Sequence, residues 1–303
     1  MSNSIPKLVV VLGPTASGKS SLGIALARRF RGEIVSADSR QAYRCLDIGT
    51  AKVTLEEQKL VPHHLLDVAD PHEAYTVAQF QRDASTAISA ILERGHQPFL
   101  VGGSPHYIQA VVDNLEIPRI EPQPELRAQL EKLPLAELLA QLEELDPQSS
   151  ATIDRHNPRR VIRALEVCLV SGKPFSQQRK LAEPFYQSLL LGIEWPRNVL
   201  YERIDKRVDE RMRQGMVQEV QRLLDEGVSY ERLEALGLEY RYVSRWLRGE
   251  FKSEDEMVVR LKYAIHDFTR RQLTWYRKDK RIVWVEGADV EKAVVVVSRF
   301  LNQ

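Results

Sequence analysis

The sequence predicts an α/β fold, in which a parallel sheet is flanked by helices and carries an inserted, mostly helical subdomain. Short apolar runs alternate with helical patterns over the first 114 residues, which is the rhythm of parallel β-α-β units. Four prolines between Pro118 and Pro134 then interrupt this rhythm. An apolar run at 189–195 (LLLGIEW) indicates a return to the sheet. We therefore expect a core of residues 1–114 and 189–303 with an insertion at 115–188.

The first strand and helix of this core enclose the most informative motif. The apolar run Lys7–Leu12 predicts a short buried strand, and the segment after Ser20 has one apolar helical face. The sequence between them fits G-x-x-x-x-G-K-[ST], the P-loop of a P-loop NTPase-like core. Its residues are Gly13, Pro14, Thr15, Ala16, Ser17, Gly18, Lys19 and Ser20.

This motif predicts a phosphate-binding site. The glycines let backbone N–H groups point at a phosphate, and the helix N-terminus adds its partial positive charge. Lys19 supplies a full charge, and Ser20 offers a hydroxyl ligand to Mg²⁺. We therefore expect a diphosphate or a nucleotide at this loop, and the sequence leaves open whether ATP binds.

The other elements follow from the same periodicities. Residues 33–38 (EIVSAD) and 98–101 (PFLV) predict buried strands, with a helix at 78–94 between them. The stretch from Glu116 to about Lys180 predicts short helices. After the return strand we expect one long helix at 201–224, a last strand at 281–285 and a closing helix at 290–301.

Polar side chains follow two of the predicted strands. Asp38, Ser39, Arg40 and Gln41 come after the second, and Gly102-Gly103-Ser104 after the third. Ligands of open α/β sheets bind beyond the carboxyl ends of the strands, so these groups should meet the P-loop in one crevice. Asp38 is a candidate general base or Mg²⁺ contact. The alternative is that Asp38, Ser39 and Ser104 cap the segments that follow them.

Two basic clusters predict contact with nucleic acid. One spans 269–278 (TRRQLTWYRK), where Arg270, Arg271 and Arg277 accompany aromatic residues, and Arg271 and Arg277 are expected on one helix. The other spans 155–160 (RHNPRR) and continues to Arg163. Solvated helix faces are the alternative for both clusters. Trp275 and Tyr276 alone fit a core position as well as a stacking platform.

Composition sets further limits. Lysine and arginine number 43 against 42 aspartates and glutamates, so the chain has no global basic field. The cysteines, Cys45 and Cys168, predict neither a disulfide framework nor a Cys-based zinc site. No run approaches the roughly 20 apolar residues of a membrane span, and the N-terminus lacks the apolar core of a signal peptide. We expect a soluble, cytoplasmic monomer without membrane contact.

Several motifs, in order and spacing, resemble the tRNA dimethylallyltransferase (tRNA isopentenyltransferase) family, in the bacterial form without a zinc finger. The resemblance runs over nearly the whole chain. The motifs are GPTASGKS at 13–20, DSRQAYR at 38–44, DIGTAK at 47–52, HHLLD at 63–67, LVGGS at 100–104, RVIRALEV at 160–167 and RQLTW at 271–275.

This resemblance implies an enzyme that attaches a dimethylallyl group to N6 of adenosine 37, next to the tRNA anticodon, and releases diphosphate. The donor is dimethylallyl diphosphate, whose diphosphate the P-loop holds with Mg²⁺ and Arg207. Asp38 matches the general base, and Ser104 is a catalytic hydroxyl where many members have Thr. The helical insertion matches the part that grips the anticodon arm. The predicted tRNA contacts are Asp38, Ser39, Arg40, Gln41, Arg159, Arg160, Arg163, Arg270, Arg271, Gln272, Thr274, Trp275 and Arg277.

The segment 155–158 (RHNP) departs from the commoner His-Pro-Asn-Asp of the family. Two rival functions use the same P-loop. A P-loop kinase of a small metabolite shares the sheet and the acid after the second strand, but does not explain the two basic clusters. A regulatory RNA-binding NTPase would turn over nucleotide without transferring a group to RNA. Labelled donor incubated with unmodified tRNA separates the three functions.

Overall fold

The computed structural model describes residues 5–118, 120–178 and 182–303, which form two compact units. The first joins the residues up to Val112 to Phe185–Gln303, and the second is Asp113–Pro184. The predicted limits of the insertion, 115 and 188, thus lie two and four residues further along the chain than 113 and 184. Lys180, where the predicted run of short helices ends, lies outside the described residues.

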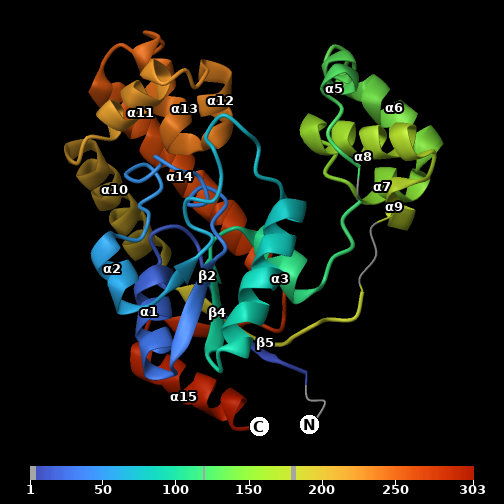
Figure 1. Ribbon diagram of the computed structural model, residues 1–303. Helices are drawn as coiled ribbons and strands as arrows, with labels where there is room; N and C mark the ends of the chain where they lie inside the picture. Colours follow the sequence, from blue (N-terminus) through green and yellow to red (C-terminus); the bar gives the residue numbers. More distant parts are fainter. Residues whose placement is uncertain (1–4, 119, 179–181) are drawn as a thin grey trace. The chain divides into compact units, whose positions relative to one another are not determined.

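The first unit is built on a six-stranded parallel sheet. Its order is β3-β2-β4-β1-β5-β6, so β1 lies between β4 and β5. Val10 of β1 pairs with Leu100 on one side and with Leu190 on the other. The predicted α/β fold with a parallel sheet is confirmed (Figure 1). The strands are β1 (Lys7–Leu12), β2 (Gly32–Ser36), β3 (His63–His64), β4 (Gln97–Gly102), β5 (Gln187–Glu194) and β6 (Val283–Glu286).

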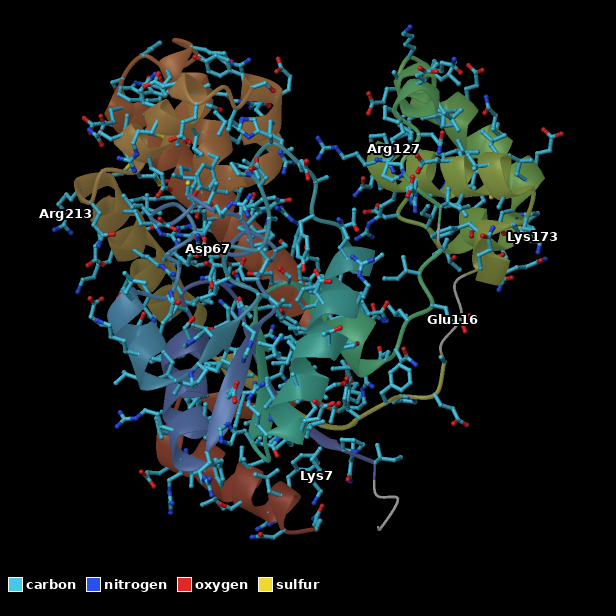
Figure 2. All side chains as sticks on the ribbon, in the orientation of Figure 1. Lys7, Asp67, Glu116, Arg127, Lys173 and Arg213 are labelled. Atoms are coloured by element: carbon cyan, nitrogen blue, oxygen red, sulfur yellow. The ribbon has the colours of Figure 1, made fainter. Side chains whose placement is uncertain are left out.

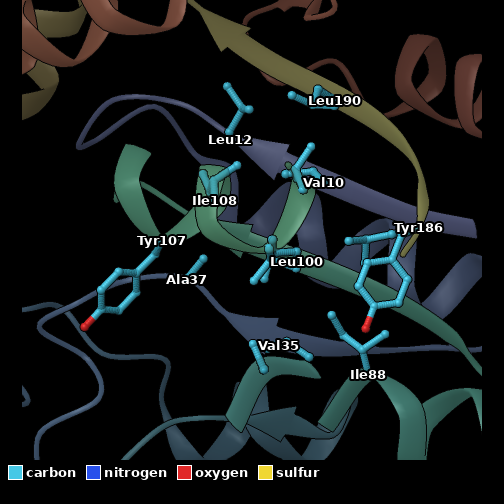
Figure 3. Close-up of a cluster of buried hydrophobic side chains, with 14 of the residues drawn as sticks. Val10, Leu12, Val35, Ala37, Ile88, Leu100, Tyr107, Ile108, Tyr186 and Leu190 are labelled. Atoms are coloured by element: carbon cyan, nitrogen blue, oxygen red, sulfur yellow. The ribbon is translucent and has the colours of Figure 1, made fainter. Parts of the chain in front are cut away.

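Helices cover both faces of this sheet because the strands are apolar on both sides. Alternate residues such as Val9 and Val11 pack against α1 (Lys19–Arg29) and α15 (Val290–Leu301). Val10 and Leu12 point the other way. They pack against α3 (Val77–Glu93) and α4 (Pro105–Val112) in the cluster that Figure 3 shows.

Five further helices form a second core in the same unit, together with residues of the loops around Tyr43 and Ala69. The predicted single helix at 201–224 is wrong. Gly215 adopts a left-handed backbone, with φ of 99°, and separates α10 from α11. The last of the five ends at Tyr276, so Arg277 is its C-cap and does not share the helix with Arg271. These helices are α10 (Arg197–Arg213), α11 (Met216–Asp225), α12 (Tyr230–Leu236), α13 (Leu238–Leu247) and α14 (Glu254–Tyr276); α2 (Leu55–Leu60) lies earlier in the chain.

The second unit is mostly helical. Its core includes Leu142 of α6 and Leu165 of α8, and the buried Glu166 binds Arg127 and Arg163 at 2.7 and 2.5 Å. Although burial alone would raise the pKa of Glu166, the hydrogen bonds from Arg127 and its neighbours hold it at about 2. Figure 2 labels Arg127 in this unit. Its helices are α5 (Pro124–Leu130), α6 (Leu135–Leu145), α7 (Pro147–Thr152), α8 (Pro158–Ser171) and α9 (Phe175–Gln178).

Candidate active site at the P-loop

The P-loop connects β1 to α1, as predicted. Two of its residues, Ala16 and Gly18, have positive φ angles of 60° and 94°. Gly18 is the N-cap of α1 and offers no side-chain cap to the helix. The amides of the first helical turn have no partner within the helix, so they and the helix dipole are left to an anion.

Three side chains from distant parts of the chain hold the P-loop backbone. Trp195 Nε1 donates to Ser17 O at 2.9 Å, and Arg203 Nε donates to Ala16 O at 2.9 Å. Gln272 Oε1 accepts from Thr15 N at 3.1 Å. The guanidinium of Arg203 also lies 4.6 Å from the centre of the Trp195 ring. No sequence pattern pointed to Trp195 or Arg203, because their partners are backbone atoms nearly 200 residues away.

Gln272 has a different place from the one predicted. Its Nε2 donates to Gly103 O at 2.7 Å while its Oε1 accepts from Thr15, and the residue is only 5% exposed. Both amide atoms are therefore used inside the protein. Gln272 ties the P-loop to the end of β4, and the prediction that it contacts tRNA is not supported by this geometry.

Three charged residues were predicted in this site, namely Lys19, Asp38 and Arg207. The charges of Asp38 and Arg207 affect the pKa of Lys19, and the charge of Asp38 also affects the pKa of Arg207. Burial lowers the pKa of Lys19 to about 8; the charge of Asp38 opposes this shift, and Arg207 adds to it. Burial also lowers the pKa of Arg207 to about 10, again with Asp38 opposing. The charge of Asp38, in the loop after β2, thus acts on two cations from other parts of the chain. Their individual roles stay predictions.

A cleft of about 840 Å³ opens beside the P-loop. Lys19 and Ser20 line it from α1, and Arg203, Lys206 and Arg207 line it from α10. Most of the remaining lining comes from residues 47–58, which no prediction had placed at the site. The cationic side next to the P-loop fits a diphosphate.

Lys52 fixes the lining segment 47–58 in place. Its Nζ donates to Tyr43 O at 2.8 Å and contacts carboxylate oxygens of Asp47 at 2.6 Å and Asp67 at 2.5 Å. Asp67 is labelled in Figure 2. The Lys52 side chain is only 5% exposed, so its ammonium group binds these partners and not a ligand in the cleft. Lys52 therefore has a structural role here, and the cations of α1 and α10 are the ones available to a phosphate.

The segment after β2 contacts the segment after β4, as predicted. Asp38 Oδ1 accepts from the backbone N–H of Arg40 at 3.0 Å, which is the local capping that was the alternative to a catalytic role. Ser104 Oγ accepts from Ser39 N at 3.0 Å and lies 3.2 Å from Ser39 Oγ. The carbonyl of Ser104 also accepts from Tyr107 N, so this residue caps α4 from the position before it, while its hydroxyl holds the Asp38 segment. Capping and a place in the site are therefore compatible for both residues.

The other two residues of this segment are Arg40, which is partly buried, and Gln41, which is buried. Gln41 is buried, and its Nε2 donates to Thr50 O and Ala51 O at 3.4 and 3.1 Å. This geometry does not support the predicted RNA contact of Gln41. Burial lowers the pKa of the Arg40 guanidinium, and the neighbouring Tyr43 and Asp38 oppose that shift.

The predicted RNA contacts around α14 are mostly at the surface. Arg270 pairs with Asp267 at 2.8 Å, and both residues are exposed. The Arg271 guanidinium lies 5.9 Å from the Phe268 ring centre. Trp275 is half-buried against the sheet core and edge-on to His106, which favours the core alternative for this ring. Thr274 and Arg277 are exposed.

In the second unit, the basic cluster also contains both exposed arginines and one that is bound inside the protein. Arg159 and Arg160 are exposed in the first turn of α8, where Asn157 is the N-cap. Arg163 instead donates to Glu166 at 2.5 Å and to Ile120 O at 3.0 Å. Its guanidinium is committed to the core of the unit, which argues against its predicted use on RNA.

The donor set fits a metal that arrives with a phosphate ligand. Among the described residues, no group of three or more His, Cys, Asp or Glu side chains could hold an ion by itself. Mg²⁺ is commonly bound through one or two protein oxygens together with water and substrate phosphates. Ser20 lines the cleft at the start of α1 and could supply such an oxygen. Within the same described ranges, no helix is both long and apolar enough to cross a membrane.

Comparisons with known proteins agree with this geometry. Residues 41–279 match the IPP transferase family. A tRNA dimethylallyltransferase of Roseiflexus sp. strain RS-1 is 43% identical over 298 residues, which cover 96% of this chain and 97% of the relative. A tRNA dimethylallyltransferase of Thermomicrobium roseum is 44% identical over 288 residues, which cover 94% of this chain and 87% of the relative.

Solved structures show the same likeness. The full-length tRNA isopentenylpyrophosphate transferase of Bacillus halodurans superimposes with a TM-score of 0.72 at 36% identity, covering 98% of this chain and 95% of that one. A eukaryotic dimethylallyltransferase acting on tRNA superimposes with a TM-score of 0.84 at 25% identity, covering 98% and 80%.

Proposed function

The chain belongs to the IPP transferase family, and on that premise we propose that it moves a dimethylallyl group from dimethylallyl diphosphate to N6 of adenosine 37 in tRNA. The membership identifies an enzyme that prenylates tRNA. The observation that supports the finer proposal is the cationic cleft beside the P-loop, lined by Lys19 and Arg207, on both of which the negative charge of Asp38 acts. Two cations suit a diphosphate leaving group, and one carboxylate suits an amine that must lose a proton.

The donor's diphosphate binds to the P-loop amides, Lys19 and Arg207. As the C1–O bond of the donor breaks, its electron pair passes to the bridging oxygen, and these cations stabilise the charge that develops there. The allylic carbon spreads the positive charge left behind. Ser20 would hold Mg²⁺ together with the phosphates, and the metal would supply further charge neutralisation.

Asp38 acts on the acceptor. The exocyclic amine of adenine is a weak nucleophile, because its lone pair is delocalised into the ring. As N6 forms its bond to C1 of the donor, the Asp38 carboxylate accepts the departing proton. Ser39 and Ser104 hold the Asp38 segment against the end of β4, which keeps the carboxylate at the site.

The tRNA must deliver an unstacked base to this pocket. An adenine stacked in the anticodon loop cannot reach Asp38, so it must be turned out of the stack. Exposed arginines on both units are suited to the backbone phosphates, namely Arg270, Arg271 and Arg277 at the end of α14 and Arg159 and Arg160 on α8. We propose that these residues grip the anticodon arm, with the protein acting as a cytoplasmic monomer.

One experiment tests the function as a whole. Purified protein is incubated with labelled dimethylallyl diphosphate, Mg²⁺ and unmodified tRNA, and the label is then located in the RNA. We expect one labelled adenosine next to the anticodon and release of diphosphate. A small-metabolite kinase would bind ATP tightly and leave the RNA unlabelled, and the family match does not favour that alternative. Nucleotide turnover stimulated by RNA without label transfer would instead indicate a regulatory NTPase.

A further inference from the structure

A third cation lies close to the diphosphate site, and no motif pointed to it. Arg211 follows Arg207 by one turn of α10 and is 5% exposed. One of its terminal nitrogens donates to Glu239 Oε1 at 2.6 Å. Its Nε is buried and has no hydrogen-bond partner among the described residues. Because a guanidinium carries five N–H donors, a single carboxylate contact leaves much of its capacity unused.

The charge of Arg211 reaches the residues that face the P-loop. Its repulsion lowers the pKa of Lys19, and it affects Arg207 more than any other charge does, second only to burial. Lys19 and Arg207, which line the cleft, and the buried Arg211 therefore form a group of three cations in which the charge of Arg211 acts on the other two. The negative charges of Glu239 and Asp38 act on Arg207 in the opposite direction and raise its pKa. Buried like charges repel strongly, and an anion that binds among them relieves the repulsion.

We propose that Arg211 is a third cation of the diphosphate site, held in place by Glu239 and acting on the anion through its charge. The inference rests on the proposed function, since it takes the P-loop ligand to be a diphosphate. That anion carries several negative charges, so a further positive charge nearby strengthens its binding. Arg211 is not among the residues that line the cleft, but it follows Arg207 by one turn of α10, so it acts through its charge and not by contact.

A purely structural salt bridge between Arg211 and Glu239 makes different predictions. In that case either single substitution lowers stability and neither changes the affinity for an anion. If the charge of Arg211 matters, the two substitutions act differently. Removing the arginine weakens anion binding, whereas Glu239→Gln keeps an acceptor for Arg211, removes a negative charge and does not weaken binding.

The test is isothermal titration of the full-length protein with inorganic diphosphate. We expect Arg211→Met to bind about tenfold more weakly than the unchanged protein, because a buried charge near the anion is lost. Arg211→Lys, which keeps the charge, should recover most of the affinity. The matched control is Arg213→Met, two residues further along α10. Arg213 is exposed at the end of that helix (Figure 2) and should leave the affinity unchanged.

The outcomes separate this inference from the proposed function. If the unchanged protein fails to bind diphosphate, the donor site itself is wrong. If that protein binds and folded Arg211→Met binds equally well, only the role of Arg211 is refuted, as it is if Glu239→Gln weakens binding to the same extent. Should Arg211→Met not fold, the double variant with Glu239→Gln removes both charges together. It must then bind diphosphate more weakly than Glu239→Gln alone.

Discussion

The side-chain oxygen of Gln272 accepts a hydrogen bond from the backbone N–H of Thr15 at 3.1 Å, across 257 residues of sequence. The same side chain donates to Gly103 O at 2.7 Å. The P-loop and the end of β4 are thus fixed to the last turns of α14. A change in the position of that helix should therefore alter diphosphate binding at the P-loop.

Gln272→Ala should therefore lower both stability and donor affinity. The substitution leaves the half-buried N–H of Thr15 and the buried carbonyl of Gly103 unpaired, and an unpaired buried group costs about 1–3 kcal/mol. Thermal unfolding and titration with diphosphate check this expectation. Gln221→Ala on the exposed face of α11 is the control. Unchanged affinity in a folded Gln272→Ala protein would separate the P-loop from α14.

Diphosphate affinity should fall as the pH rises above about 8. Burial lowers the pKa of Lys19 to about 8 in the free protein, and a bound anion favours the charged amine and raises that pKa. Below pH 8, Lys19 is charged in both states and contributes no pH dependence. Above it, binding must take up a proton, so affinity drops by up to about tenfold per pH unit. Lys19→Met should bind weakly and lose this fall, whereas an equal fall in that variant would assign it to another group.

Two Tyr→Phe substitutions should change stability in opposite directions. Tyr276 is fully buried in the sheet core, and its hydroxyl has no hydrogen-bond partner among the described residues. Tyr240 is equally buried, but its hydroxyl donates to Glu219 at 2.8 Å. We expect Tyr276→Phe to raise the free energy of unfolding by about 1 kcal/mol and Tyr240→Phe to lower it by about 1–3 kcal/mol. Denaturant titrations measure both, and a loss of stability in Tyr276→Phe would show that its hydroxyl has a partner.

Neutralising Arg159 and Arg160 together should weaken tRNA binding and flatten its salt dependence. Each lost phosphate contact lowers the slope of log affinity against log salt by about one unit on duplex and about 0.7 on single strands. Lys173→Ala is the control, because Lys173 lies beyond the other end of α8 (Figure 2). Affinity and slope equal to those of the unchanged protein would mean that this pair is a solvated helix face. Diphosphate binding should not change in either variant.

Most strands of the sheet could be predicted from the sequence, because each of them is a short apolar run. The apolar run Lys7–Leu12 and the glycine motif after it fix β1, the P-loop and α1 within a residue or two. A short strand such as β3, with only His63 and His64, has no such pattern and was missed. The break at Gly215 was also missed, since a glycine inside a charged helical pattern does not by itself show a left-handed turn.

The site could be predicted only as far as the ligand-facing residues. Lys19 and Asp38 come from the motifs GPTASGKS and DSRQAYR, whereas Arg207 was expected from the family resemblance alone; the charge of Asp38 acts on both cations. Gln41 belongs to DSRQAYR and Gln272 to RQLTW, but their amides bond to backbone groups. A sequence pattern does not distinguish a polar side chain that faces a ligand from one that satisfies a buried carbonyl. Distant supports such as Trp195 depend on tertiary packing and leave no local signal.

The central claim is that Asp38 takes the proton of the acceptor amine beside a P-loop that holds the donor's diphosphate. Single-turnover transfer from labelled dimethylallyl diphosphate to unmodified tRNA, compared between the unchanged protein and Asp38→Asn, tests it most directly. We predict that Asp38→Asn transfers about 10²–10⁴-fold more slowly, the usual cost of losing a positioned base, while its affinities for tRNA and for diphosphate change little. A near-normal rate of transfer by Asp38→Asn would contradict the claim and remove Asp38 from the role of base.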